Sequence, residues 1–257
     1  MPKPTLSLSL LVLFASGCFL PEPRTVDTRE LSLDASALDT LRIDVGAGDL
    51  DVVGDPTIDA IEVRVCLRTN SGIDASDDRA REALDARLET DGSDGVLYVH
   101  IADGPDGYYA DVTVALPSSL RVAARDGSGD IRLRAVAALD LVDDSGDVDI
   151  EDVAGPVTVD DESGDLRIVT AGPVSVVDTS GDLTIEDVGG DVVIEDDSGE
   201  IVVDGVDGDV DVTDGSGGIV VRHVTGRVTV RDGSGDIEVT DVGDFELLED
   251  GSGSVRS

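Results

Sequence analysis

Residues 161–168 read Asp-Glu-Ser-Gly-Asp-Leu-Arg-Ile, and variants of this octet recur along the second half of the chain. The octet at 143–150 is Asp-Asp-Ser-Gly-Asp-Val-Asp-Ile, and the one at 178–185 is Asp-Thr-Ser-Gly-Asp-Leu-Thr-Ile. Successive copies are 17 or 18 residues apart, as their serines show: Ser128, Ser145, Ser163, Ser180, Ser198, Ser216, Ser234 and Ser252. Such a period is typical of a solenoid, in which each repeat packs only on its neighbours.

A weaker half-repeat lies between the octets. It reads Val-Ala-Gly-Pro-Val-Thr-Val at 153–159 and Val-Gly-Gly-Asp-Val-Val-Ile at 188–194. Each repeat thus contains two short strands after glycine turns, and alternate apolar side chains such as Leu183 and Ile185 point inward. We therefore predict an all-β fold, a parallel β-solenoid with coils of about 18 residues and two short strands per coil.

Residues 39–125 are less regular, and we expect them to cap the N-terminal end of the solenoid. Segments 41–45 and 50–53 look like an opening coil, and further strands are expected at 61–67, 96–101 and 109–116. One helix is predicted over about 75–88, where the apolar residues fall on one face: Ala80, Ala83, Leu84 and Leu88. The repeat solenoid itself is expected over residues 126–257.

The N-terminus has the features of a secretory signal peptide over residues 1–17. A short positive start precedes an apolar run from Leu6 to Phe14, which is too short to span a membrane. The following Ala-Ser-Gly-Cys resembles the lipobox of bacterial lipoproteins, with Ala15 where leucine is usual. This resemblance implies that Cys18 is acylated, and Phe19 after it favours the outer membrane. Ordinary cleavage nearby is the alternative. Residues 18–38 are predicted to form a tether.

Composition excludes some classes of protein. The chain carries 57 acidic residues against 18 Lys and Arg, a net charge of −39, which would repel the phosphates of nucleic acids. Its hydrophobic fraction of 40% is too high for a disordered acidic tail. Two cysteines cannot form a disulfide framework, and Cys66 is expected to be a buried core thiol.

The segments that resemble catalytic or metal-binding motifs have simpler interpretations. The Ser-Gly pair after an acid is reminiscent of a protease nucleophile, but eight stacked copies and only two histidines, His100 and His223, indicate turn hydroxyls. Segment 207–218 begins like an EF-hand loop yet lacks the required glycine and glutamate. We therefore predict no catalytic residue and no cofactor.

Stacked coils should place acidic residues in columns. Neighbouring unit charges about 4.8 Å apart repel by roughly 0.9 kcal/mol in water. Either the turn N–H groups stabilise these carboxylates while some stay protonated, or cations, with Ca²⁺ as the candidate, bind between them loosely or in ordered sites. The candidate cation columns contain Asp147, Asp165 and Asp182 after the glycines, and Asp143, Asp161 and Asp178 at the starts of the octets.

The whole pattern is similar to a known family. A lipoprotein signal, a mixed N-terminal part and Ser-Gly-Asp-apolar-x-apolar repeats over roughly residues 39–257 resemble the bacterial "putative adhesin" domain of unknown function. The resemblance implies a parallel β-solenoid on an envelope lipoprotein, and it brings no catalytic residues with it.

Three functions follow as hypotheses. The first is a lipid-anchored cell-envelope protein whose acidic solenoid is a non-catalytic binding or adhesive surface for a glycan or protein. The second is a structural or envelope-stress component without a specific ligand. The third, a solenoid polysaccharide-degrading enzyme, is disfavoured because the nearly constant coil length leaves no loops to build a groove. End-to-end self-association or a strand-donating partner is expected at residues 254–257, which begin a fresh coil.

Overall fold

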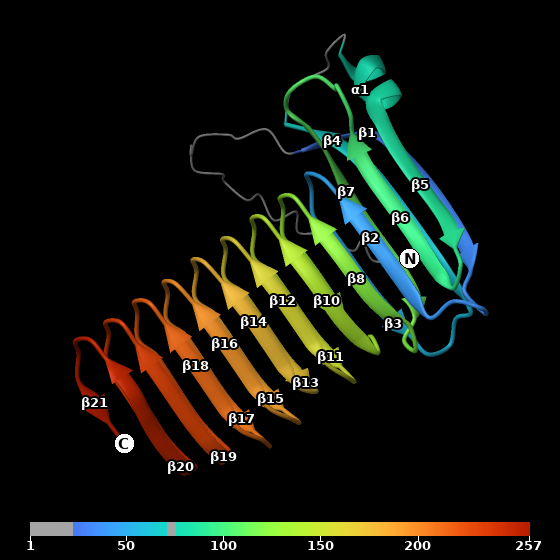
Figure 1. The fold of residues 1–257 in the computed structure, drawn as a ribbon. Helices are drawn as coiled ribbons and strands as arrows, with labels where there is room; N and C mark the ends of the chain where they lie inside the picture. The colour runs from blue at the N-terminus through green and yellow to red at the C-terminus, as the bar shows by residue number, and fades with distance from the viewer. Residues whose placement is uncertain (1–22, 71–75) are drawn as a thin grey trace, which may run out of the picture.

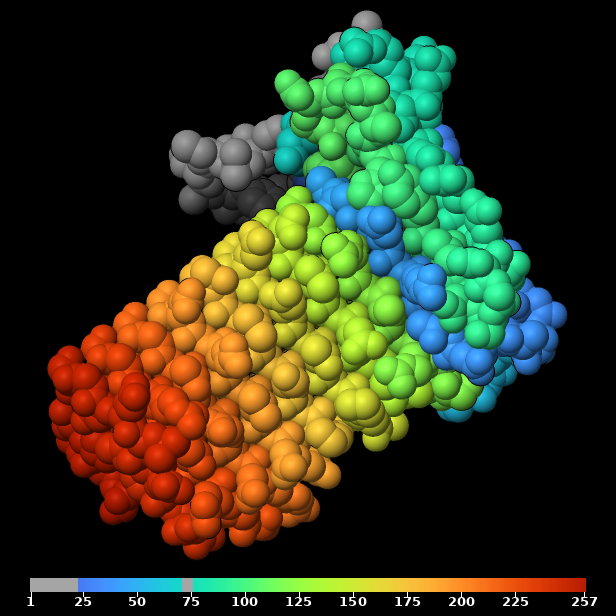
Figure 2. Space-filling model, in the orientation of Figure 1, coloured from blue at the N-terminus to red at the C-terminus, as the bar shows by residue number. Residues whose placement is uncertain are grey.

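The computed structural model describes residues 23–70 and 76–257; the predicted signal peptide and Cys18 lie outside them. The chain winds into a stack of coils with two flat parallel faces, called here the front sheet and the back sheet (Figure 1). An antiparallel N-terminal part stands at an angle to this stack (Figures 1 and 2). The predicted parallel β-solenoid is confirmed.

The front sheet faces the viewer in Figure 1, and its coil strands pair in parallel and in register. At its N-terminal edge β5 pairs antiparallel with β6. In spatial order its strands are β5 (Leu84–Asp91), β6 (Asp94–Ile101), β2 (Thr40–Val45), β8 (Arg121–Asp126), β10 (Ala138–Asp143), β12 (Val157–Asp161), β14 (Val174–Asp178), β16 (Val192–Asp196), β18 (Val210–Asp214) and the second halves of β19 (Ile219–Asp232) and β20 (Ile237–Asp250).

The back sheet contains the other strand of each coil, again in parallel register. Its N-terminal end is extended by two antiparallel pairings, β7 with β4 and β4 with β1. In spatial order its strands are β1 (Arg24–Asp34), β4 (Ala60–Thr69), β7 (Tyr108–Pro117), β3 (Leu50–Asp55), β9 (Ile131–Arg134), β11 (Val148–Val153), β13 (Leu166–Ala171), β15 (Leu183–Val188), β17 (Ile201–Val206), the first halves of β19 and β20, and β21 (Val255–Arg256).

The core is a thin layer between the two sheets, and the predicted alternation fills it. In β14 and β15 the inward side chains Val174, Val176, Leu183 and Ile185 are at most 2% exposed. Val188, at the end of β15, is buried as well. Because each coil contributes so few apolar side chains, its stability depends on stacking against the next coil.

Glycine forms the corner between each front strand and the following back strand. Gly181 has a φ of 144°, which L side chains rarely adopt. A Cβ at this position would overlap the carbonyl oxygen of Gly164 in the preceding coil. The coils can therefore approach to strand-pairing distance only if this position lacks a side chain.

Two boundaries predicted for the N-terminal part are wrong. The tether over 18–38 contains strand β1, which pairs with β4 and packs Leu31 and Leu33 against the core. The helix over 75–88 shortens to α1 (Asp77–Ala83), because the alternating positions from Leu84 onward form β5. The opening coil expected at 41–45 and 50–53 is confirmed, since β2 and β3 pair in parallel with β8 and β9.

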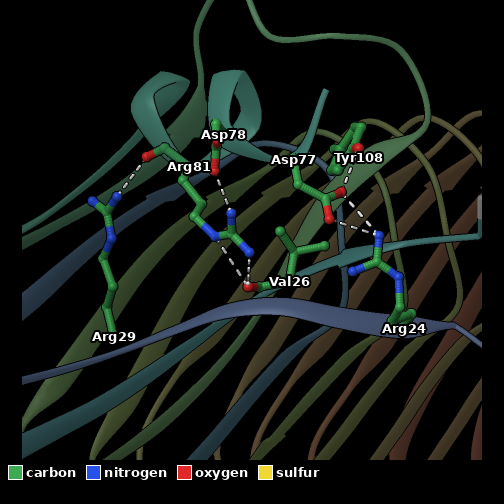
Figure 3. A network of polar contacts seen from close by, with 7 residues as sticks. All are labelled: Arg24, Val26, Arg29, Asp77, Asp78, Arg81 and Tyr108. Atoms are coloured by element: carbon green, nitrogen blue, oxygen red, sulfur yellow. Dashed lines mark hydrogen bonds and ion pairs between the residues drawn. The ribbon is translucent and has the colours of Figure 1, made fainter. Parts of the chain in front are cut away.

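Arginines tie the edge strands of the two sheets together around α1 (Figure 3). The Arg29 guanidinium donates hydrogen bonds of 2.8 Å to the carbonyl oxygens of Arg81 and Leu84. The Arg81 guanidinium in turn donates to the carbonyl oxygen of Val26 at 3.1 and 3.3 Å. These bonds satisfy carbonyls at the helix end and join β1 to β5, which closes the N-terminal end of the core.

Candidate functional site

The front sheet has a hollow where it crosses from β6 to β12. Its volume is about 550 Å³, and its floor contains buried strand residues such as Ile43 and Leu141. Small outward side chains, Ala123 and Thr158, lie between longer ones in neighbouring strands, which leaves the surface recessed. The outward side chains around it include Arg42, Val96, Arg125, Asp140, Val142 and Asp160.

Charge around the hollow is mixed, which is unusual in so acidic a chain. Arg42 is paired with Asp94, and Arg121 reaches the Asp140 carboxylate at 3.5 Å. Arg125 is exposed, and no ion pair engages it within residues 23–70 and 76–257. An arginine without a carboxylate partner beside apolar side chains is a suitable contact for an anionic or polar ligand.

On the back sheet, Arg167 is surrounded by carboxylates. The Arg167 guanidinium lies 3.2 Å from Asp149, 3.3 Å from Glu151 and 3.3 Å from Glu186. Exposed ion pairs of this kind contribute little stability. They do give Arg167 the carboxylate partners that Arg125 lacks.

A histidine–aspartate pair lies at the N-terminal corner of the front sheet. His100 Nε2 is 2.7 Å from Asp44 Oδ1, and the imidazole stacks on Tyr98 with ring centroids 4.3 Å apart. The Arg87 guanidinium covers Tyr98 at 4.6 Å. His100 borders a second hollow of about 340 Å³ next to Gly46 and Tyr108.

Seven of the eight aspartates that begin the octets are buried, not exposed as a charged column, and only Asp250 in the last octet is exposed. Each buried aspartate is the last residue of a front strand and points into the core. Their relative exposure is at most 4%, and they are Asp126, Asp143, Asp161, Asp178, Asp196, Asp214 and Asp232. We call this set the buried aspartate ladder.

Burial raises the pKa values of the ladder. Loss of hydration, reinforced by the charges on Asp143 and Asp144, raises the pKa of Asp126 to about 8. Burial together with ladder neighbours raises the pKa values of Asp161, Asp178 and Asp214 to about 6, and burial next to Asp144 does the same for Asp143. The ladder thus favours protonated carboxyls far above the usual range of aspartate.

The other predicted column remains on the surface, and backbone groups engage it. Asp147 Oδ1 accepts the N–H of Asp165 at 3.2 Å, and Asp165 Oδ1 accepts the N–H of Asp182 at 3.0 Å. Asp182 continues the series by accepting the N–H of Glu200 at 3.0 Å. Across residues 23–70 and 76–257, no group of three or more His, Cys, Asp or Glu side chains is arranged to hold a metal ion.

The repeat serines act on the backbone. The Ser180 hydroxyl donates to the carbonyl oxygen of Glu162 at 3.3 Å, and the Ser198 hydroxyl donates to that of Thr179 at 3.2 Å. These contacts link successive coils. They agree with the interpretation of the repeat serines as turn hydroxyls. The expectation for Cys66 is wrong, because it lies half-buried on the outer side of β4 while Val65 and Leu67 point inward.

The coil geometry can be compared with known proteins. The profile of the Toastrack DUF4097 family matches residues 25–247. The chain belongs to this family. No curated protein matches the chain.

Solved structures share the Toastrack fold. A "putative adhesin" from Parabacteroides distasonis is 14% identical with a TM-score of 0.52, over 90% of this chain and 97% of that one. A "putative lipid binding protein" from the same organism is 17% identical with a TM-score of 0.52, over the same shares of the two chains. At such identities the likeness concerns the fold alone. In the part of this Toastrack chain that the structure describes, the helix is too short to cross a bilayer.

The front-sheet hollow was not predicted from the sequence. The alternation in β8 could have placed Ala123 and Arg125 on the outer side, because Val122 and Ala124 are apolar. The sequence of β8 does not show which strands lie beside it. The hollow depends on β8 lying between β2 and β10, with β6 beyond β2, and this order follows from the insertion between β3 and β8.

Proposed function

We propose that this Toastrack protein is a lipid-anchored cell-envelope protein whose acidic solenoid is a non-catalytic binding or adhesive surface. The lipobox-like residues 15–18 support an anchor at Cys18, and Phe19 favours the outer membrane. One solved structure with this fold is named a "putative adhesin". The anchor would leave the solenoid free to face a partner outside the membrane.

The front-sheet hollow is the observation that supports binding best. Its floor and rim combine apolar side chains, Val96 and Val142, with an unengaged Arg125 and the acceptor Asp140. A surface glycan fits this chemistry, because its ring faces can pack on the valines while its hydroxyls and acidic groups meet the charged side chains. Glycan recognition at the hollow is therefore the form of the proposal that we test.

A glycan array with the full chain carrying Cys18→Ser tests this binding. Arg125→Ala should weaken binding about tenfold or more, since a hydrogen bond to a charged group contributes roughly 1.5–3 kcal/mol. Arg134→Ala is the matched control: it removes the same charge from the back sheet, where β9 exposes Arg134. Equal losses in both variants would contradict binding at the hollow, and no bound glycan would favour the structural alternative without a ligand.

Cell fractionation tests the anchor separately. Cys18→Ser should move the protein from the membrane fraction to the soluble fraction, because acylation needs the thiol. Continued membrane retention of Cys18→Ser would contradict the lipid anchor while leaving the binding surface open to its own test.

A further inference from the structure

The buried aspartate ladder has a regular geometry. The end residues of the front strands pair in register, Asp143 with Asp161 and Asp161 with Asp178, and the series continues to Asp232. Strands pair about 4.8 Å apart, so each carboxyl has another directly above and below it. The ladder therefore forms a line of carboxyls along the inside of one corner of the solenoid.

Only half of the carboxyl oxygens have a donor in most of the ladder. Oδ1 of Asp161, Asp178 and Asp214 accepts the N–H of the serine two residues later, at 3.2, 3.0 and 2.9 Å. Asp196 and Asp232 repeat this contact. Oδ2 of these five residues is buried without a partner, and so are both oxygens of Asp126 and Asp143. An ionised carboxylate in that condition is strongly unfavourable.

The surrounding charges do not compensate for burial. The charged groups that act on the ladder, apart from its own members, are all acidic: Asp144, Asp160, Asp182, Asp197 and Asp250. The two arginines that directly precede ladder residues, Arg125 and Arg231, point outward from β8 and β19, and Arg231 pairs with Asp211. Among the described residues no cation faces the ladder, so a proton on one carboxyl is the donor that can serve the unpartnered oxygen of the next.

Asp126 and Asp143 form the pair in which the lack of hydrogen-bond donors is greatest. The two residues pair in register, and the charge on Asp143 helps to raise the pKa of Asp126. No N–H donor meets the four oxygens of this pair. A proton shared between the two carboxyls removes one buried negative charge and supplies one of the missing hydrogen bonds.

We propose that the buried aspartate ladder is a chain of carboxyls that share protons. The solenoid is therefore pH-sensitive: its folded state is most stable in mild acid and becomes less stable as the ladder loses its protons. The ladder is a binding site whose ligand is the proton. The proposal does not depend on glycan binding or on the lipid anchor.

The direction of the pH effect follows from the raised pKa values. Asp143, Asp161, Asp178 and Asp214 have folded pKa values of about 6 against an ordinary value of 3.8 for aspartate, so the folded state binds their protons about a hundredfold more tightly. Their contribution to stability is fully present below about pH 4 and declines as the pH rises to about 6. Asp126, with a pKa of about 8, extends the decline to that pH.

Thermal unfolding of the full chain carrying Cys18→Ser, followed from pH 4.5 to 8.5, tests the proposal. We expect the Tm to fall by more than about 5 °C over this range. The fall should persist in 1 M NaCl, because salt screens exposed charges and leaves buried ones largely unaffected. A Tm that rises with pH, or a slope abolished by salt, would overturn the proposal.

A matched pair of variants separates the ladder from general acidity. Asp161→Asn with Asp178→Asn keeps an acceptor for each serine N–H and adds a donor for the next carboxyl, so it should raise the Tm at pH 8 and flatten the pH dependence. Asp165→Asn with Asp182→Asn removes the same charge from the exposed column and should keep the slope of the parent protein. Equal slopes in the two double variants would contradict the ladder.

Infrared spectroscopy supplies a readout that does not depend on the variants folding. The parent protein should show a protonated carboxyl band at pH 6 that is lost by pH 9. An absence of this band at pH 6 would overturn the proposal whatever the variants do.

Discussion

Nη2 of Arg24 donates to both oxygens of the Asp77 carboxylate, at 2.9 and 3.0 Å (Figure 3). The Tyr108 hydroxyl donates to the same carboxylate at 2.8 Å. This pair joins the start of β1 to the start of α1, and the hydrogen bond from Arg24, with that from Tyr108, holds the pKa of Asp77 below its usual value. The pKa of Asp77 is thus shifted in the opposite direction to the pKa values of the buried aspartate ladder.

Acid should therefore loosen the helix before it loosens the solenoid. Asp77 contributes stability above the unfolded pKa of an aspartate and loses it as the pH falls through the lower folded pKa. Below about pH 4 we expect faster hydrogen exchange at the α1 amides, with the solenoid strands still protected. Arg24→Ala should give the same pattern at neutral pH, whereas Arg64→Ala, which removes an exposed pair with Glu30, should leave α1 unchanged.

Thr170 is strained at the second corner of its coil. Its φ is 56°, in the left-handed region that costs a residue with a Cβ about 1–2 kcal/mol. Thr170→Gly should relieve this strain and stabilise the protein by about 1 kcal/mol in chemical unfolding. Thr158→Gly, at an extended position in the middle of β12, should instead destabilise it. Destabilisation in both variants would show that the corner is not strained.

The glycine column should tolerate no side chain. Gly181→Ala places a methyl group against the carbonyl of Gly164 at a positive φ, and we expect a loss of more than about 3 kcal/mol in urea unfolding. Gly189→Ala is the control, because its Cβ would meet only the Ala171 carbonyl oxygen at 3.6 Å. Similar stabilities for the two variants would mean that the coils can separate at the corner without cost.

The face formed by β20 and β21 exposes large apolar side chains. Leu247, Leu248 and Val255 are 37%, 43% and 37% exposed. We expect two copies to pair through this face once salt screens their charge, because strand edges and apolar side chains are both available there. Sedimentation in 1 M NaCl should show concentration-dependent dimers that Leu247→Asp abolishes. Val177→Asp, at a similarly exposed front-sheet position, should not affect them.

The octet repeat contained enough information to predict the coils, their inward side chains and the glycine corners. The N-terminal part was harder to predict because its order in space differs from its order in sequence. Strand β1 is mostly polar, and only Leu31 and Leu33 indicate which of its sides packs on the core. The strand is stabilised by pairing with β4, which is distant in the chain. Long-range pairing of this kind leaves little trace in local sequence.

The burial of the ladder had a sequence signal that charge obscured. Val157 and Val159 point inward, so strict alternation also places Asp161 inward. The same rule places Cys66 outward, because Val65 and Leu67 occupy the inner side. In both cases residue chemistry suggested one side and strand periodicity the other, and the periodicity was correct. For Asp161 the cost of burial is reduced by the turn N–H of Ser163.

The in-register coils also have a consequence for evolution. Each coil presents the same corner glycine, serine and aspartate to the next, so duplication of one whole coil preserves every contact at the junction. Such an event would lengthen the molecule by about 4.8 Å, the spacing of one strand, and would leave the N-terminal part untouched. Duplication or loss of whole coils can thus change the length of the solenoid in uniform steps.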